Sequence, residues 1–113
     1  MAFVPPDSGE FDVRVTAVAR VQEPTAGGGL AESYVTVATV RARLRSLFGS
    51  RTIEGEQTTE RATHVFTIRA REAARGWRYL EALGRRFRIH SVLDQGRRRQ
   101  WQELLAEELG NAD

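Results

Sequence analysis

Arginine is the residue type in this chain with the clearest capacity to bind a charged partner. Arg41, Arg43 and Arg45 alternate along a stretch with the periodicity of a strand. Alternate residues of a strand share one face and lie about 7 Å apart, so this row could contact successive phosphates of a nucleic acid. The alternative is an ordinary charged outer face opposite the core of a sheet. The row is therefore a candidate for DNA-phosphate contacts.

Arg97, Arg98 and Arg99 form a second basic group, directly after the turn-like sequence Asp94-Gln95-Gly96. On a strand, Arg97 and Arg99 would share one side and Arg98 would take the other. A continuous three-arginine surface would then not form, and no aromatic residue alternates with the triplet to stack on bases. The triplet is more typical of the charged shoulder of a hairpin than of a DNA-reading motif.

Catalytic and metal-binding chemistry has little support in the sequence. His64 and His90 are the only histidines, and a histidine on an inward strand face is usually a hydrogen-bonded packing residue. His90 and Ser91 are neighbours on a predicted strand, so their side chains diverge and cannot form a nucleophile–base pair. No residue spacing fits a zinc site, and the glycine run 27–29 lacks the lysine of a phosphate-binding loop. The sequence predicts a protein that is not an enzyme, with no metal and no cofactor.

Composition limits the class of protein further. The chain has 113 residues, 41% hydrophobic and 28% charged, which is typical of a soluble globular domain. No apolar run approaches the roughly 20 residues that span a bilayer, no secretory signal is visible, and cysteine is absent. All 17 basic residues are arginine, and guanidinium groups suit planar contacts with carboxylates and phosphates. The alternative explanation for the missing lysine is a GC-rich genome, which favours arginine codons. We expect a protein that acts in the cytoplasm or in an assembly built there.

Alternation of apolar and polar residues predicts a chain made mostly of strands. In chain order the predicted strands lie at 12–22, 33–47, 61–71, around 77–80 and at 87–93. The glycine run 27–29 joins the first two, and Asp94-Gln95-Gly96 is a hairpin signal. The side chains predicted to face inward include Val13, Val15, Val40, Leu44, Phe66, Ile68, Phe87, Ile89 and Leu93.

Two segments are harder to assign. Residues 100–109 fit a helical stripe through Trp101, Leu104 and Leu105 as well as a strand, and periodicity slightly favours the helix. Residues 49–60 are polar and too long for a hairpin turn, so they predict a long loop, with a short helix inside it as an alternative. We predict one all-β domain over 1–113, a small antiparallel barrel or sandwich of about six strands. Its flanking parts are an N-terminal arm at 1–11 and a C-terminal tail at 109–113.

Four stretches, taken in order, carry a family resemblance. They read GGGLAESYVTVATVRARL (27–44), ERATHVFTIRAR (60–71), GRRFRIHSVLD (84–94) and GRRRQWQELLAEEL (96–109). The resemblance covers roughly residues 12–108. Their order and spacing resemble the head-closure, or head–tail joining, family of tailed phages and gene transfer agents. The third is similar to that family's glycine–arginine–aromatic core, and the fourth to its arginine-rich turn and closing segment. The family often has Trp where this chain has Tyr34, and Cys where it has Ala106. Both positions tolerate such a change in side-chain volume.

The resemblance implies a small β-barrel subunit that forms a ring in the virion neck. The ring would lie between the portal–adaptor assembly and the tail terminator and tail tube, and it would hold packaged double-stranded DNA in the head. Assembly would take place in the host bacterial cytoplasm, without a membrane. The family's closing segment is a strand, which overrides the helical periodicity after Trp101. Arginine–glutamate pairs across repeated subunit contacts would give geometric specificity, and arginines facing the channel would meet DNA through phosphates.

Two further residue groups are candidates for contacts in such a ring. The candidates for the subunit interface are arginines, namely Arg85, Arg86, Arg97, Arg98 and Arg99. The candidates for the channel or a neighbouring ring lie on the long loop, namely Arg51, Ile53, Glu54, Glu56 and Glu60. In that loop Ile53 would be the apolar anchor and the glutamates would repel DNA phosphate. A surface loop without such a contact is the alternative.

Two other classes of protein stay open at this point. A small barrel with a pI of 9.9 also fits an OB-like module that binds nucleic acid by itself. The other class is a neighbouring neck component. An adaptor would be mainly helical, which the dominance of period-2 alternation disfavours. A tail terminator would have a fuller α+β pattern, and the sequence has no evident long helix.

Overall fold

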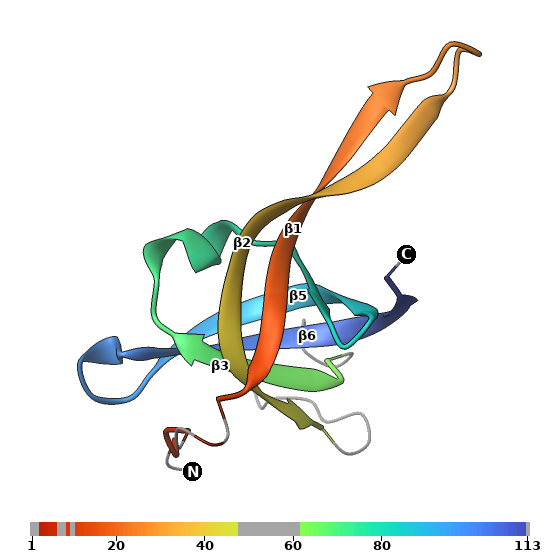
Figure 1. Cartoon of the computed structure of the whole chain (residues 1–113). Coiled ribbons are helices and arrows are strands. Elements are labelled where there is room, and N and C mark those ends of the chain that lie inside the picture. Colours follow the sequence, from red (N-terminus) through yellow and green to blue (C-terminus); the bar gives the residue numbers. More distant parts are fainter. Residues whose placement is uncertain (1–2, 7–8, 10, 48–61, 113) are drawn as a thin grey trace.

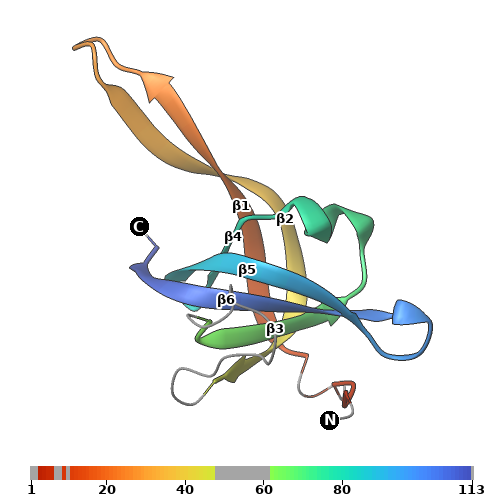
Figure 2. The ribbon, with the colours of Figure 1, turned by 180° about the vertical axis from the view of Figure 1, so that it is seen from behind.

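The structure, a computed structural model, describes residues 3–6, 9, 11–47 and 62–112. It contains six strands and two 3-10 helices, in the order β1 (Val13–Pro24), β2 (Leu30–Ser46), β3 (His64–Arg69), η1 (Glu72–Gly76), β4 (Tyr79–Ala82), β5 (Arg85–Gln95), η2 (Arg97–Arg99) and β6 (Trp101–Asn111). Antiparallel pairing joins the strands into one closed barrel in the order β1-β2-β3-β6-β5-β4 (Figure 1 and Figure 2). The predicted small antiparallel barrel of about six strands is confirmed. In this described part of the chain, no helix is long and apolar enough to cross a membrane.

Apolar side chains fill the barrel. Phe66 and Phe87 meet edge to face, with ring centroids 4.9 Å apart, and Ile68, Leu80 and Leu104 are fully buried with them. Each such side chain contributes about 1.5–3 kcal/mol when it leaves water. The predicted inward set is confirmed for all but its last member, with buried or partly buried positions for Val13, Val15, Val40, Leu44, Phe66, Ile68, Phe87 and Ile89.

Leu93 is the exception, and a β-bulge is the reason. The register of β5 against β6 shifts after Ile89, where His90 is an extra residue in the ladder. A one-residue shift moves every following side chain to the opposite face of the sheet. Val92 therefore packs against the core, and Leu93 is 38% exposed.

The helix that periodicity favours near the C-terminus is wrong, and the strand implied by the family resemblance is right. β6 pairs with both β3 and β5. Its inward-facing Leu104 is buried, but outward-facing Trp101 and Leu105 are buried too. Phe11 covers the part of this outer face at Trp101, which it meets edge to face with centroids 5.6 Å apart. A strand covered on both faces loses its alternation, so its apolar residues resemble a helical stripe.

The first hairpin extends far beyond the barrel (Figure 1). β1 pairs with β4 only at residues 16–18, and β2 pairs with β3 only at residues 43–46. Beyond the barrel the two strands pair only with each other, from Ala19 opposite Val35 to Pro24 opposite Leu30. Residues 19–35 are termed the projecting hairpin. It lengthens the molecule to principal extents of 53 × 28 × 23 Å.

The ends of the chain and the long loop complete the picture. β6 runs to Asn111, so residues 109–111, predicted as tail, belong to the barrel. The predicted loop 49–60 lies outside the described residues, and so do its candidates Arg51, Ile53, Glu54, Glu56 and Glu60. Their contact with a channel or a neighbouring ring stays a prediction.

Candidate functional site

The arginine triplet lies in the connection between β5 and β6, not on a strand as the sequence suggests. Arg98 and Arg99 have left-handed φ values of 60° and 53°, and Gly96 has a φ of 82°. A non-glycine residue in such a conformation costs on the order of 1–3 kcal/mol. Arg97, Arg98 and Arg99 are all exposed, and none of the ion pairs found in the described part of the chain includes them. The alternating faces expected for the triplet are therefore wrong, because a tight turn holds it.

Arg86 is tied to its own chain. Its Nε and Nη2 both donate to Glu81 Oε2, at 3.1 and 2.8 Å, and its side chain is 16% exposed. The guanidinium also stacks 3.7 Å from the centroid of the Tyr34 ring, which meets Tyr79 edge to face. Arg86 thus fastens the base of the projecting hairpin to β4. Its neighbour Arg85 pairs with Glu108 at 3.4 Å and is half exposed.

The row of alternating arginines is interrupted. Arg41 and Arg45 are exposed, but Arg43 is only 5% exposed. Its Nη2 donates to Thr67 Oγ1 at 3.5 Å, and its guanidinium lies 5.9 Å from the centroid of the Phe3 ring. Arg41 Nη1 donates to the Asp12 carbonyl at 3.3 Å. A continuous exposed row along this strand does not form.

A basic hollow that the sequence did not single out lies between β2 and the end of β3. Its volume is about 410 Å³, and it is termed the arginine groove. Phe11, Val40 and Ile68 give it apolar walls, with Thr39 at its edge. Its charged lining consists only of arginines, namely Arg14, Arg41, Arg69 and Arg71.

The four arginines of this groove have no carboxylate partner in the part of the chain that the structure describes. Arg14 and Arg41 are direct cross-strand partners, an arrangement of like charges that is unfavourable without a counterion. Arg69 lies over the Trp101 ring at 4.8 Å, and Arg71 over the Trp77 ring at 5.5 Å. Other arginines of the barrel instead pair with acids, as in Arg75–Asp94, Arg85–Glu108 and Arg86–Glu81.

Half of this groove could have been found from the sequence. A hairpin around the glycine run 27–29 brings Arg14 close to Arg41, and the register shift between Ala17 and Val18 sets the two directly opposite. Arg69 and Arg71 join them only because β2 and β3 separate beyond Arg43. That separation has no sequence signal.

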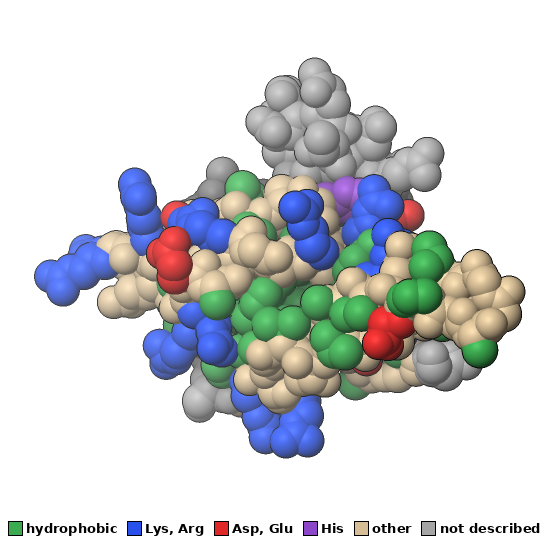
Figure 3. Space-filling model, turned by 90° about the horizontal axis from the view of Figure 1, so that it is seen from above, with side chains coloured by type: hydrophobic (Ala, Val, Ile, Leu, Met, Phe, Trp, Pro, Cys, Tyr) green, Lys and Arg blue, Asp and Glu red, His purple; other side chains and the backbone are tan. Residues whose placement is uncertain are grey.

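A second hollow, of about 690 Å³, lies at the base of the projecting hairpin. Val18 and Val37 line it on the hairpin side, and Trp77, Arg78 and Arg88 on the other. The view from above the molecule shows apolar side chains gathered near the centre and arginine side chains around its margin (Figure 3). The base of the projecting hairpin thus forms one wall of this hollow.

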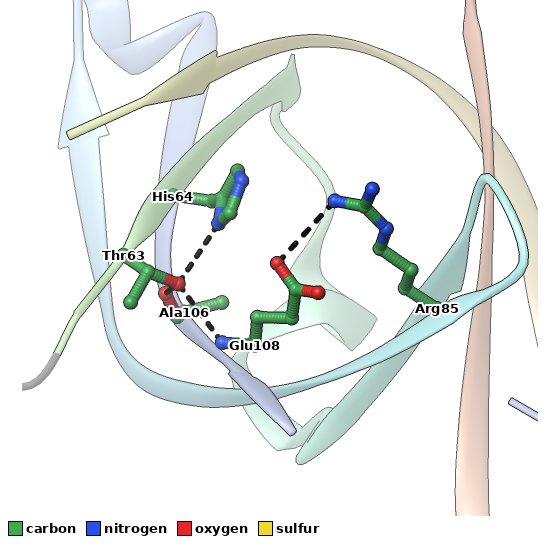
Figure 4. Close-up of polar contacts among 5 residues, drawn as sticks. All are labelled: Thr63, His64, Arg85, Ala106 and Glu108. Carbon is green, nitrogen blue, oxygen red and sulfur yellow. Dashed lines mark hydrogen bonds and ion pairs between the residues drawn. The ribbon is translucent and has the colours of Figure 1, made fainter. Parts of the chain in front are cut away.

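The histidines occupy structural positions. Thr63 Oγ1 lies 2.8 Å from His64 Nδ1 and accepts the backbone N–H of Glu108 at 2.9 Å, so it links the start of β3 to β6 (Figure 4). The His64 ring packs against Phe87, and burial lowers the pKa of His64, opposed by Glu108 and assisted by Arg85. His90 Nε2 lies 2.9 Å from Glu107 Oε1 across β5 and β6.

Neither histidine belongs to a metal-binding cluster. Among the described residues, no group of three His, Cys, Asp or Glu side chains could hold a metal ion. The polar groups around His64 are satisfied by each other and by the backbone of β6. The charged surfaces of the barrel are therefore the candidate functional sites.

The barrel is similar in fold to a chain from a solved particle, the virion of a native gene transfer agent. The match has a TM-score of 0.54 and 18% sequence identity, and it covers 86% of this chain and 94% of that chain. A search of curated proteins found no match.

The sequence itself assigns the family. Residues 6–109 match the phage head completion protein family, and the chain belongs to it. It is accordingly a structural component of a phage virion that takes part in completing the head. Membership of a family of structural proteins supports the view that the chain is not an enzyme.

Proposed function

We propose that the chain forms a closed ring in the virion neck, between the portal–adaptor assembly and the tail, and that this ring helps retain packaged DNA. The expected ring is six- or twelve-fold. The observation that carries the proposal is the projecting hairpin, because in the described part of the chain its two strands pair only with each other. Its exposed apolar side chains include Leu30 (66%) and Val35 (47%), and Val37 (54%) is exposed just beyond its base.

A hairpin of this kind needs a neighbour. A two-stranded hairpin is marginally stable in water, and an exposed edge strand is a template for pairing with another chain. Both outer edges of the projecting hairpin are unpaired in the described chain. Identical subunits in a ring would cover these edges repeatedly and give each hairpin the same surroundings.

Basic side chains give the ring its proposed relation to DNA. Arg41, Arg45 and the triplet 97–99 are exposed, so any of them that faces the channel would meet phosphates without reading sequence. Arg85 and Arg86 are proposed to contribute less to the subunit interface than the triplet does. Both already form ion pairs within their own chain, with Glu108 and Glu81. The loop 49–60 is proposed to narrow the channel or contact the next ring.

The OB-like alternative lacks an exposed stacking platform among the described residues. Trp77 and Trp101 are 7% and 8% exposed, and Arg86 covers the Tyr34 ring. Single-strand binders stack bases on accessible aromatic rings, so this barrel is poorly suited to that role. The six-stranded architecture also disfavours the helical adaptor and the α+β tail terminator.

Particles made without this protein test the proposal. Heads should fill with DNA but fail to join tails, and they should release DNA that nuclease then degrades. Complementation with the intact chain should restore both retention and tail joining. Normal tailed, DNA-filled particles in the absence of the protein would contradict the proposal.

A further inference from the structure

We propose that the arginine groove receives the tip of the projecting hairpin from a neighbouring copy of this chain. Leu30 would enter the apolar part of the groove, and Glu23 and Glu32 would pair with its guanidinium groups. The inference rests on the proposed ring and names the two surfaces that close it.

The groove has the chemistry of a site for an acidic segment with an apolar anchor. Four arginines surround it without a carboxylate partner in the described chain, while Phe11, Val40 and Ile68 supply apolar contact. Guanidinium binds carboxylates in planar, two-point geometry. A bare phosphate backbone would leave these apolar walls unused, so the groove favours a peptide over DNA.

The hairpin tip has the complementary chemistry. Leu30 lies opposite Pro24 in the ladder and is 66% exposed. Glu32, two positions further along β2, shares the face of Leu30, and Glu23, opposite Ala31, lies on the other face of the tip, so a groove that encloses the tip can meet both carboxylates. Glu32 makes a long ion pair of 3.7 Å with Arg20, and both side chains are about half exposed. Such a surface pair is weak and can be exchanged for a better one. Glu23 has no ion pair among the described residues.

The tip cannot reach the groove of its own subunit. Arg14, at the groove, and Glu23, near the tip, are nine positions apart on the same strand, roughly 30 Å at about 3.3 Å per residue. The hairpin points away from the barrel (Figure 1). A tip from one copy in the groove of the next is a head-to-tail contact, and such contacts close into rings when the rotation allows.

Thiol cross-linking tests the contact, because the chain has no native cysteine. Leu30→Cys combined with Thr39→Cys, both at exposed positions, should give a ladder of disulfide-linked oligomers on mild oxidation of the full chain. Leu30→Cys alone should stop at dimers. Leu30→Cys with Arg78→Cys places the second thiol in the other hollow and should also stop at dimers. A ladder from that pair, or none from Leu30→Cys with Thr39→Cys, would overturn the inference.

Charge reversal tests the chemistry of the contact. Glu23→Arg with Glu32→Arg, or Arg41→Glu with Arg71→Glu, should each reduce the ladder at least tenfold, and combining the four changes should restore it. Arg78→Glu with Arg88→Glu, at exposed positions in the other hollow, changes the net charge as much as the groove pair and should leave the ladder intact. Groove reversal that weakens binding of short duplex DNA but not the ladder would assign the groove to phosphate and refute a hairpin site.

The outcome for the contact is separable from the outcome for the neck. Particles that carry Glu23→Arg with Glu32→Arg and still show a neck ring of this protein would refute the groove contact and leave the proposed function standing. Unmodified particles whose neck lacks this protein would refute the proposed function itself.

Discussion

The barrel and the projecting hairpin both contain valine and leucine side chains, but the barrel buries them and the hairpin exposes them. In the barrel, Val15 and Leu80 are completely buried and every strand has two neighbours. In the hairpin, Leu30 and Val35 are largely exposed and each strand has one neighbour. The difference teaches that the barrel buries its own apolar surface, while the hairpin has apolar surface and strand edges that no described part of the chain covers. Stability and assembly should therefore respond to different mutations.

The largest loss of stability is expected from a mutation in the core of the barrel. Phe66 is completely buried against Phe87, so Phe66→Ala leaves a cavity and removes transfer energy. We expect a fall of about 3–5 kcal/mol in the free energy of unfolding, measured by denaturant titration. A fall under about 1 kcal/mol would show that the barrel is not the stable unit.

A smaller loss is expected where the arginine turn meets the barrel. Gly96 has a φ of 82°, and an added Cβ would lie 3.0 Å from Trp101 Cδ1. Gly96→Ala should lower the free energy of unfolding by roughly 1–3 kcal/mol through backbone strain and crowding. Gly29→Ala, near the hairpin tip and without positive φ, is the matched control and should change stability little. Equal effects at both glycines would contradict this account of the turn.

A pH-dependent effect is expected at His64. Burial lowers its pKa from the usual 6.5, so the unfolded chain binds a proton more readily than the folded one. The contribution of neutral His64 is complete above pH 6.5 and is lost as the pH falls below that value. His64→Gln should flatten the change in the free energy of unfolding between pH 7 and pH 5. An unchanged slope in that variant would assign the pH dependence to other groups.

The smallest effect on stability is expected at the hairpin. Replacing residues 22–32 with a two-residue turn removes only exposed strand and no core residue. The melting temperature of the barrel should stay within a few degrees, since surface changes are usually within about 0.5 kcal/mol. Self-association, measured by sedimentation, should nevertheless be lost. A large drop in melting temperature would remove the distinction between the two regions.

The sequence predicts most of this fold for a clear reason. A barrel core needs alternation, and Val13, Val15, Phe66 and Ile68 keep it without interruption. The failures come from features that alternation does not encode. The bulge at His90 moves every later side chain of β5 to the opposite face of the sheet.

Contacts distant in sequence also escaped prediction. Phe11 covers the outer face of Trp101, so β6 has apolar residues on both faces. The left-handed turn at Arg98 could not be seen in a run of three identical residues. The arginine groove depends on where β2 leaves β3, which is a property of barrel closure.

Imaging the neck of intact particles at side-chain resolution tests the central claim most directly. We predict a closed ring of these barrels in which the hairpin of each subunit crosses to the next, with Leu30 within contact distance of the neighbour's groove at Val40. A ring whose hairpins contact only their own barrels, or a neck that contains no ring of this chain, would contradict the account.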